Sequence, residues 1–197
     1  MHRYRKQNVV YKGLRFSSDL VEHVFKDRKW LLASIIAGLF GIFVAMVYKR
    51  LFFSLFFIGL GSISMVYQRY FKYSSYIGFE LCMLGTVLAG LRYGSHYGVF
   101  VGAASIIGAF ALSGNIKPSS FVSVLTLPLI GAITPLLSDI PIVHLGVFMT
   151  ILYDAIILPL YVLLGSRIVS SLVFFCTHVL MNYWVFTNIA PIILRFM

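Results

Sequence analysis

The chain has 197 residues, of which 60% are hydrophobic and 11% charged, and its mean hydropathy is +0.93. Several apolar runs approach the roughly 20 residues that a helix needs to cross a bilayer, so the composition predicts a polytopic membrane protein. The net charge of +10 lies beside these runs, which indicates membrane topology and argues against a nucleic-acid-binding surface. Cys82 and Cys176 both fall within apolar runs and have the spacing of neither a disulfide framework nor a metal site.

Residues 1–29 form a basic tail that carries eight of the sixteen Lys and Arg residues. Such an excess predicts a cytoplasmic location. Within the tail, the stretch "SSDLVEHVFKDRK" places apolar residues on one helical face and charged residues on the other, which predicts a short helix lying on the membrane surface. A topological anchor is the preferred interpretation, and a contact with anionic lipid or a partner is the alternative.

The remainder divides into an N-terminal transmembrane hairpin, residues 30–70, and a transmembrane bundle, residues 71–197. We predict an all-α membrane protein of six or seven helices, with boundaries near 30–48, 51–68, 73–93, 95–113, 119–138, 141–164 and 168–190. With the N-terminus inside, twelve basic residues lie on the cytoplasmic side and four outside. Six prolines in the second half predict bent helices.

The stretch "GLRYGSHYGVFVG" has glycines at every fourth position, namely Gly90, Gly94, Gly98 and Gly102. One continuous helix over residues 73–113 would be roughly 60 Å long, about twice the hydrocarbon thickness, so the segment has to break. Arg92 and His96 are the strongly polar residues near its middle, which predicts a turn at "RYGSH". Beyond that turn, Gly98 and Gly102 continue as a small-residue face that another backbone can approach closely.

A second small-residue stripe lies in the first span, where Ala33, Ala37, Gly41 and Ala45 are each four residues apart. Such a stripe predicts a surface on which another helix docks. The spacing leaves open whether that helix belongs to this chain or to a partner.

Ionisable side chains at membrane depth are costly and are therefore candidate functional residues. The candidates are Glu80 in the third span, Asp154 in the sixth and His178 in the seventh, with Asn182 one turn after the histidine. Together they predict a mid-membrane polar pocket for a small solute, or a proton relay through the three ionisable groups. The alternative is that each is neutralised by a neighbouring helix and serves only in packing.

Enzyme signatures are missing from the sequence. It contains no "HExxH", "GxSxG" or "GxxxxGK[ST]" motif, which argues against a zinc protease, a nucleophile-elbow hydrolase or a P-loop ATPase. We expect no enzymatic activity, no metal site and no cofactor.

Three features resemble the substrate-binding S components of energy-coupling factor transporters and the MreD-type membrane proteins that share their fold. The run "LAGLRYGSHYGVFVGAAS", residues 88–105, is similar to the glycine-rich connection between consecutive S-component helices. The Ala33 to Ala45 stripe is similar to their docking surface for the coupling partner, and "THVLMNYWVF", residues 177–186, looks like a terminal helix that carries binding residues. The resemblance covers mainly residues 73–190.

This resemblance implies a solute-binding subunit in the cell membrane, which works with a transmembrane coupling subunit and a pair of ATPases on a vitamin-sized solute. The alternative function is a noncatalytic scaffold of the MreD type. Two features differ from the family: S components usually have six helices with both termini inside, and their glycine-rich turn is cytoplasmic, whereas our count is seven and places Arg92 outside.

Overall fold

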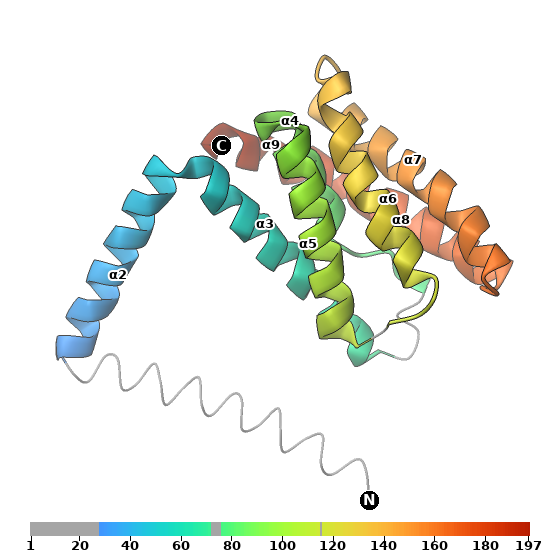
Figure 1. Cartoon of the computed structure of the whole chain (residues 1–197), viewed down its shortest axis with the longest axis horizontal. Coiled ribbons are helices and arrows are strands. Elements are labelled where there is room, and N and C mark those ends of the chain that lie inside the picture. Colours follow the sequence, from blue (N-terminus) through green and yellow to red (C-terminus); the bar gives the residue numbers. More distant parts are fainter. Residues whose placement is uncertain (1–27, 72–75, 115) are drawn as a thin grey trace, which may run out of the picture. The chain divides into compact units, whose positions relative to one another are not determined.

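The computed structural model describes residues 28–71, 76–114 and 116–197, apart from the side chains of residues 28 and 44–46. Every regular element in these ranges is helical (Figure 1). The helix expected on the membrane surface in the basic tail lies almost entirely outside them. The chain divides into two compact units, Met1–Tyr48 and Lys49–Met197, which are described separately.

The first unit contributes one described helix, α2 (Arg28–Val47). Its apolar residues are spread around the whole helix, as expected for a segment surrounded by lipid. Ala33, Ala37 and Gly41 of the predicted docking stripe are exposed on it, whereas the side chain of Ala45 lies outside those described. Helix α2 has 20 residues, about the length that a helix needs to cross a bilayer.

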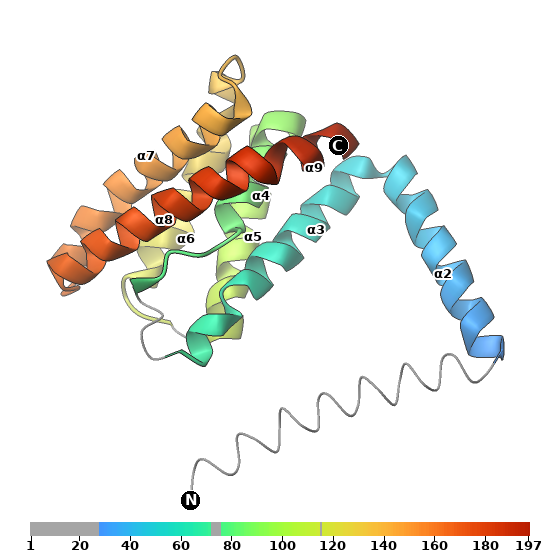
Figure 2. The same ribbon diagram turned by 180° about the vertical axis from the view of Figure 1, so that it is seen from behind.

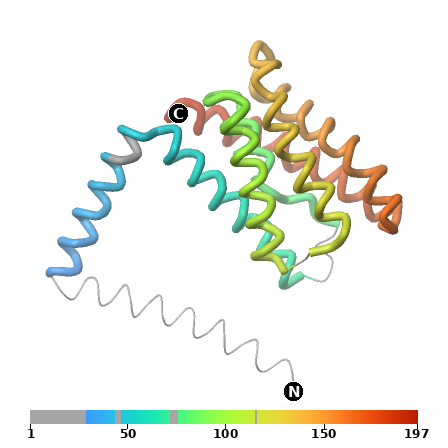
Figure 3. The backbone as a smooth tube through the Cα atoms, viewed as in Figure 1, coloured from blue at the N-terminus to red at the C-terminus, as the bar shows by residue number. Residues whose placement is uncertain are grey.

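The second unit is a bundle of helices joined by short turns, whose order can be followed along the tube in Figure 3. Its elements are α3 (Lys49–Ser64), η1 (Val66–Arg69), α4 (Cys82–Tyr93), α5 (Ser95–Ser113), α6 (Ser120–Ile133), η3 (Thr134–Leu137), α7 (Ile142–Leu163), α8 (Ile168–Asn188) and α9 (Ala190–Phe196).

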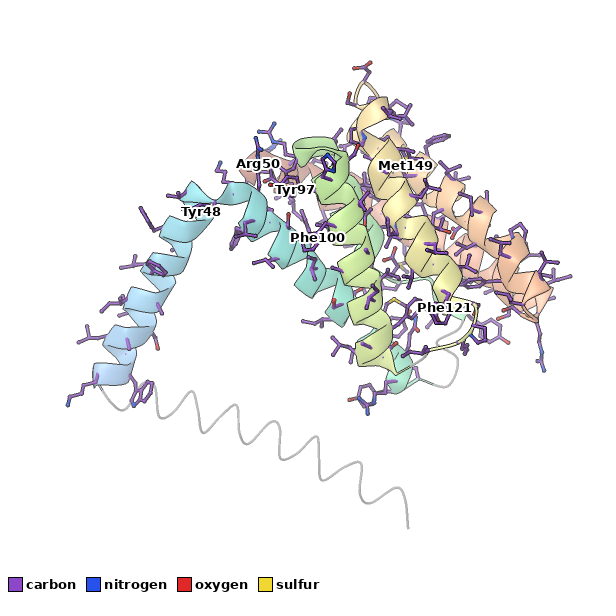
Figure 4. The ribbon with its side chains drawn as sticks, in the orientation of Figure 1. Tyr48, Arg50, Tyr97, Phe100, Phe121 and Met149 are labelled. Carbon is purple, nitrogen blue, oxygen red and sulfur yellow. The ribbon has the colours of Figure 1, made fainter. Side chains whose placement is uncertain are left out.

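Five helical segments of this unit are long and apolar enough to cross a membrane: Lys49–Arg69, Ser95–Ser113, Ser120–Leu137, Ile142–Leu163 and Ile168–Asn188. Their outward faces carry large apolar side chains, such as Phe100 on α5 and Phe121 on α6, whereas Met149 on α7 is fully buried (Figure 4). These features support an integral membrane protein.

Helix α3 belongs to the bundle, because it packs against α4 and α5. The structure therefore begins the bundle at Lys49, whereas the sequence suggested an N-terminal hairpin ending at residue 70. Gly61 explains the contact, since a Cβ atom there would lie 2.9 Å from the Cβ of Ser105 and 3.1 Å from the sulfur of Cys82. A small residue on α3 thus allows α4 and α5 to pack closely against it.

The predicted third span, residues 73–93, is only partly helical. Residues 77–81 have no helical structure, and α4 begins at Cys82. Its 12 residues extend about 18 Å, well short of the hydrocarbon thickness. Glu80, expected two turns inside a helix, instead precedes the first turn of α4.

Helix α4 is nonetheless the centre of the bundle, since every residue from Cys82 to Gly90 is buried. It packs against α3, α5, α6, α7 and α8. The chain then turns at Gly94, whose φ of +96° is a conformation that favours glycine, and α5 begins at Ser95. The break therefore lies within "RYGSH", and Arg92 and His96 beside it are exposed.

The glycine face of α5 lies against α6. A Cβ atom at Gly98 would meet the backbone of Gly131, with the Cα of Gly131 at 2.9 Å, and one at Gly102 would lie 3.1 Å from the carbonyl oxygen of Leu127. A Cβ atom at Gly90 of α4 would likewise lie 2.9 Å from the carbonyl oxygen of Gly131. Three helices thus cross with their backbones in contact, as small residues permit in membranes.

Candidate functional site

The non-helical segment before α4 is held by side chains of its neighbours. The backbone N–H of Gly78 donates to the Thr177 hydroxyl at 2.9 Å, and the Tyr67 hydroxyl donates to the carbonyl oxygen of Ile77 at 2.7 Å. The N–H of Leu81 donates to the Ser64 hydroxyl at 3.0 Å. Irregular backbone at membrane depth is tolerated where its polar groups find partners in buried protein or at a cavity. These hydrogen bonds supply such partners for the segment.

Gly78 lies directly against α8, and Figure 2 shows the connection that leads into α4 running past this helix. A Cβ atom at this position would lie 2.5 Å from the Cβ of His178 and 2.6 Å from its Cα and backbone nitrogen. Real Cβ atoms do not approach other atoms this closely, so only glycine fits. The contact brings the following residues of the segment, including Glu80, beside the histidine.

Glu80, His178 and Asp154 form one buried cluster. The Nδ1 atom of His178 lies 2.9 Å from each carboxylate oxygen of Asp154, and its Nε2 atom lies 3.1 Å from Oε1 of Glu80. His178 and Asp154 are completely buried, and Glu80 is 9% exposed. Three of the four predicted site residues therefore come together, with one carboxylate at each nitrogen of the His178 ring.

Each member of the cluster is positioned by its own element. Asp154 lies on the buried face of α7, and His178 lies on the buried face of α8. The Phe174 ring stacks on His178 with ring centroids 5.2 Å apart, and Tyr153 approaches edge-on at 5.9 Å. Glu80 accepts hydrogen bonds from the backbone N–H of Met83 at 3.0 and 3.2 Å, which holds a carboxylate at the positive end of α4.

Both nitrogens of His178 face carboxylate oxygens, and only an imidazolium can donate to both. With the ring protonated, the cluster holds one positive and two negative charges. An uncompensated buried charge is costly, so this arrangement favours either a further proton or a cationic group supplied from outside. Glu80 is the member through which such a group gains access, because Asp154 is fully covered.

Asn182 lies one turn after His178 on the same buried face of α8. Its amide nitrogen donates to the carbonyl oxygen of His178 at 3.1 Å, while its side-chain oxygen is buried without a hydrogen-bond partner. Asn182 therefore adjoins the cluster through the backbone of α8 and does not contact either carboxylate.

A cavity of about 520 Å³ opens beside the cluster, a volume within the range of ligand pockets. Glu80 and His178 line it, whereas Asp154 and Asn182 do not. Its lining includes six aromatic side chains and as many serines; the aromatic residues are Tyr76, Phe79, Phe110, Tyr153, Tyr161 and Phe174. The hydroxyls of Tyr161 and Ser123 are 2.6 Å apart and join two of the helices that border the cavity, α7 and α6.

Two cations lie at the mouth of this cavity. Lys117 precedes α6 and Arg167 precedes α8, both side chains are exposed, and both residues line the cavity. From sequence, both count among the twelve basic residues predicted on the cytoplasmic side, without any connection to the buried cluster. No sequence signal connects them, because Lys117 and Arg167 are fifty residues apart. The packing of α6 with α7 and of α7 with α8 brings both cations to one cavity.

The described residues include no group of three His, Cys, Asp or Glu side chains placed to hold one metal ion. The cluster itself does not qualify, because its two carboxylates occupy opposite nitrogens of the imidazole ring and do not converge on one point.

The fold and the site together describe an integral membrane helix bundle with a short central helix, a buried ionisable cluster and an adjoining cavity. Comparison of the chain with protein-family models, curated protein sequences and solved structures finds no match.

Proposed function

We propose that this chain is the membrane-embedded, solute-binding subunit of a transport system, and that the cavity beside Glu80 and His178 is its binding site. The observation that carries the proposal is a cavity of ligand size that reaches two buried ionisable side chains. The proposal assigns binding to this cavity and no catalysis.

The non-helical segment before α4 supports this function. Transporters commonly build their substrate sites from discontinuous membrane helices, whose freed backbone and helix ends face the cavity. Here the short helix α4 is preceded by the non-helical residues 77–81, and Gly78, Phe79 and Glu80 of this segment line the cavity. A chain that served only to pack other helices would have no need of this costly segment.

The cavity also separates the proposal from its alternative. A scaffold of the MreD type is expected to be a filled bundle whose outer surface recruits other membrane proteins, with polar residues that only pack. An aromatic-walled cavity with a carboxylate inside it favours a solute-binding protein.

The resemblance to S components is supported by the connectivity of the Lys49–Met197 unit. In our proposal it makes six passes, namely the five span-length segments α3, α5, α6, α7 and α8, and residues 76–93, where the short helix α4 and the non-helical segment before it together count as one pass. In this comparison, transport requires a separate coupling subunit and an ATPase pair, and the exposed stripe on α2 is the proposed docking surface for the coupling subunit.

We further propose that the protein resides in the cell membrane with a cytoplasmic N-terminus. If α2 crosses the bilayer, the Gly94 turn then lies outside and the mouth at Lys117 opens to the cytoplasm; the orientation of S components is the reverse. A membrane-impermeant maleimide distinguishes the two on intact cells, in a background where the exposed Cys176 is replaced by Ser. We expect labelling of Arg92→Cys and not of Ile116→Cys, and the opposite result would give the S-component orientation.

The proposed function is tested by identifying the small molecules that wild-type protein retains when purified from its native membrane in mild detergent. We expect a stoichiometric solute, and at least tenfold less of it with Glu80→Gln, because a charged partner is lost. The variant should keep its thermal midpoint, since Asp154 and His178 remain as a neutral pair.

Asp139→Asn is the matched control, because it removes an exposed carboxylate in the turn before α7. It should retain the solute like wild type. Equal retention by Glu80→Gln would refute the assigned site, and copurification of envelope proteins without any small molecule would favour the scaffold.

A further inference from the structure

We infer that the solute is dipolar: an aromatic or similarly flat molecule with a protonated nitrogen at one end and an acid group, such as a phosphate or carboxylate, at the other. This inference rests on the proposed function and deepens it by naming the solute class. The same cavity carries negative charge at its inner end and positive charge at its mouth.

The inner end selects a cation. Glu80 and Asp154 flank one histidine, so the protonated cluster has one negative charge in excess. Of the two carboxylates, Glu80 alone lines the cavity. A protonated nitrogen beside Glu80 would balance the excess charge and would gain a charge-assisted hydrogen bond.

The mouth selects an anion. Lys117 and Arg167 both line it, and no carboxylate of the described residues forms an ion pair with either. Arg presents several donors that suit a phosphate or carboxylate, and Lys adds a point charge. The two cations are therefore available to the acid group of a solute whose other end reaches Glu80.

The aromatic part of the lining favours a flat group between the two ends. Six aromatic side chains line the cavity together with six serines, and of these aromatics Phe174 stacks on one face of the His178 ring and Tyr153 approaches its edge. Aromatic side chains favour stacked or edge-on contacts with another ring. The cavity thus matches a ring that carries opposite charges at its two ends.

Three probes with one skeleton test this inference. Tyramine phosphate carries both charges, tyramine carries the amine without the phosphate, and 4-ethylphenyl phosphate carries the phosphate without the amine. Their binding to the full-length protein in detergent is measured by calorimetry or by the shift in thermal midpoint. We expect tyramine phosphate to bind at least about tenfold more tightly than either single-charge probe.

Two variants connect each charge with its end of the cavity. Glu80→Gln should weaken tyramine phosphate at least about tenfold and leave 4-ethylphenyl phosphate unchanged. The double variant Lys117→Gln/Arg167→Gln should weaken tyramine phosphate and leave tyramine unchanged. Asp139→Asn is again the control and should alter none of the three.

Equal binding of tyramine and tyramine phosphate would overturn the anionic end, and equal binding of 4-ethylphenyl phosphate would overturn the cationic end. If none of the three binds while wild-type protein still retains a copurified solute, the dipolar class is wrong and the proposed function stands. If no solute is retained either, both fail.

The headgroup of an ethanolamine phospholipid carries the same two charges without a ring. Glycerophosphoethanolamine therefore serves as a fourth probe. Weaker binding than that of tyramine phosphate supports an aromatic solute, whereas equal or tighter binding would assign the cavity to a lipid headgroup and refute the flat middle.

Discussion

Two halves of the Lys49–Met197 unit are built on opposite principles. Where α4, α5 and α6 cross, the backbones touch through Gly90, Gly98 and Gly131. Where residues 76–81 meet α7 and α8, the contact is made by Glu80, Asp154 and His178, and a cavity remains beside them. In the first half glycines let the helix backbones touch, and in the second half polar side chains meet beside a cavity.

The contrast shows how a small bundle can combine rigidity with a binding site. In a bilayer the hydrophobic effect does not drive helices together, so close van der Waals contact between small residues supplies much of the stability. The glycine contacts among α4, α5 and α6 can then hold α4 in place, although the segment that precedes α4 is not helical. The following predictions test this division, starting from the largest expected effect.

Replacing His178 with Leu should destabilise the protein most, because it leaves the buried carboxylate of Asp154 without a partner. Breaking a buried ion pair by removing one member costs about 3–5 kcal/mol. The thermal midpoint in detergent measures the loss. The double variant Asp154→Leu/His178→Leu should recover part of it, and a double variant no more stable than the single would contradict the assigned pair.

Replacing Gly98 with Ala should be the next most harmful change, because the new methyl group would overlap the backbone of Gly131. Overpacking of this kind costs about 1–3 kcal/mol. Gly59→Ala on α3 is the matched control, since a Cβ atom added there would have no atom within 4 Å beyond its chain neighbours and the nearby backbone of its own helix. The control should hold or raise the thermal midpoint, as Ala is the better helix former by up to about 1 kcal/mol. Equal effects would remove the close crossing of α5 and α6.

Replacing Gly78 with Ala should disturb the site more than the fold. The added Cβ would displace the non-helical segment from the backbone of His178 and move Glu80 with it. We expect a stability loss of about 1 kcal/mol and a clear loss of retained solute. Gly98→Ala in the folded fraction provides the comparison, because it lies outside the cavity. Full retention by the Gly78 variant would show that the segment does not position Glu80.

Replacing Asn182 with Leu should have the smallest effect, within about 1 kcal/mol, and the thermal midpoint is expected to rise. The buried side-chain oxygen of Asn182 has no hydrogen-bond partner, so its removal relieves a desolvation cost. A marked fall in the midpoint would indicate that this oxygen is bonded, and would return Asn182 to the site with the other three residues.

Much of the fold and of the candidate site could be predicted from the sequence. Long apolar runs are a direct requirement of the bilayer, so membrane-spanning helices could be predicted from composition and length. The turn after Tyr93 was also readable, because a single helix over residues 73–113 would be too long and charged residues mark its middle. The cost of a charge at membrane depth likewise singled out Glu80, Asp154 and His178 before any contact was known.

Tertiary structure decided the rest. The helix before Gly94 begins only at Cys82, and the segment ahead of it is held by the contact of Gly78 with the backbone of α8, between residues a hundred positions apart. The same packing joins Lys117 and Arg167 to the cavity of Glu80, although no local pattern links them. Hydropathy and spacing report what each segment needs from the membrane, whereas a site depends on which segments meet, and that is set by the long-range packing of backbones and side chains.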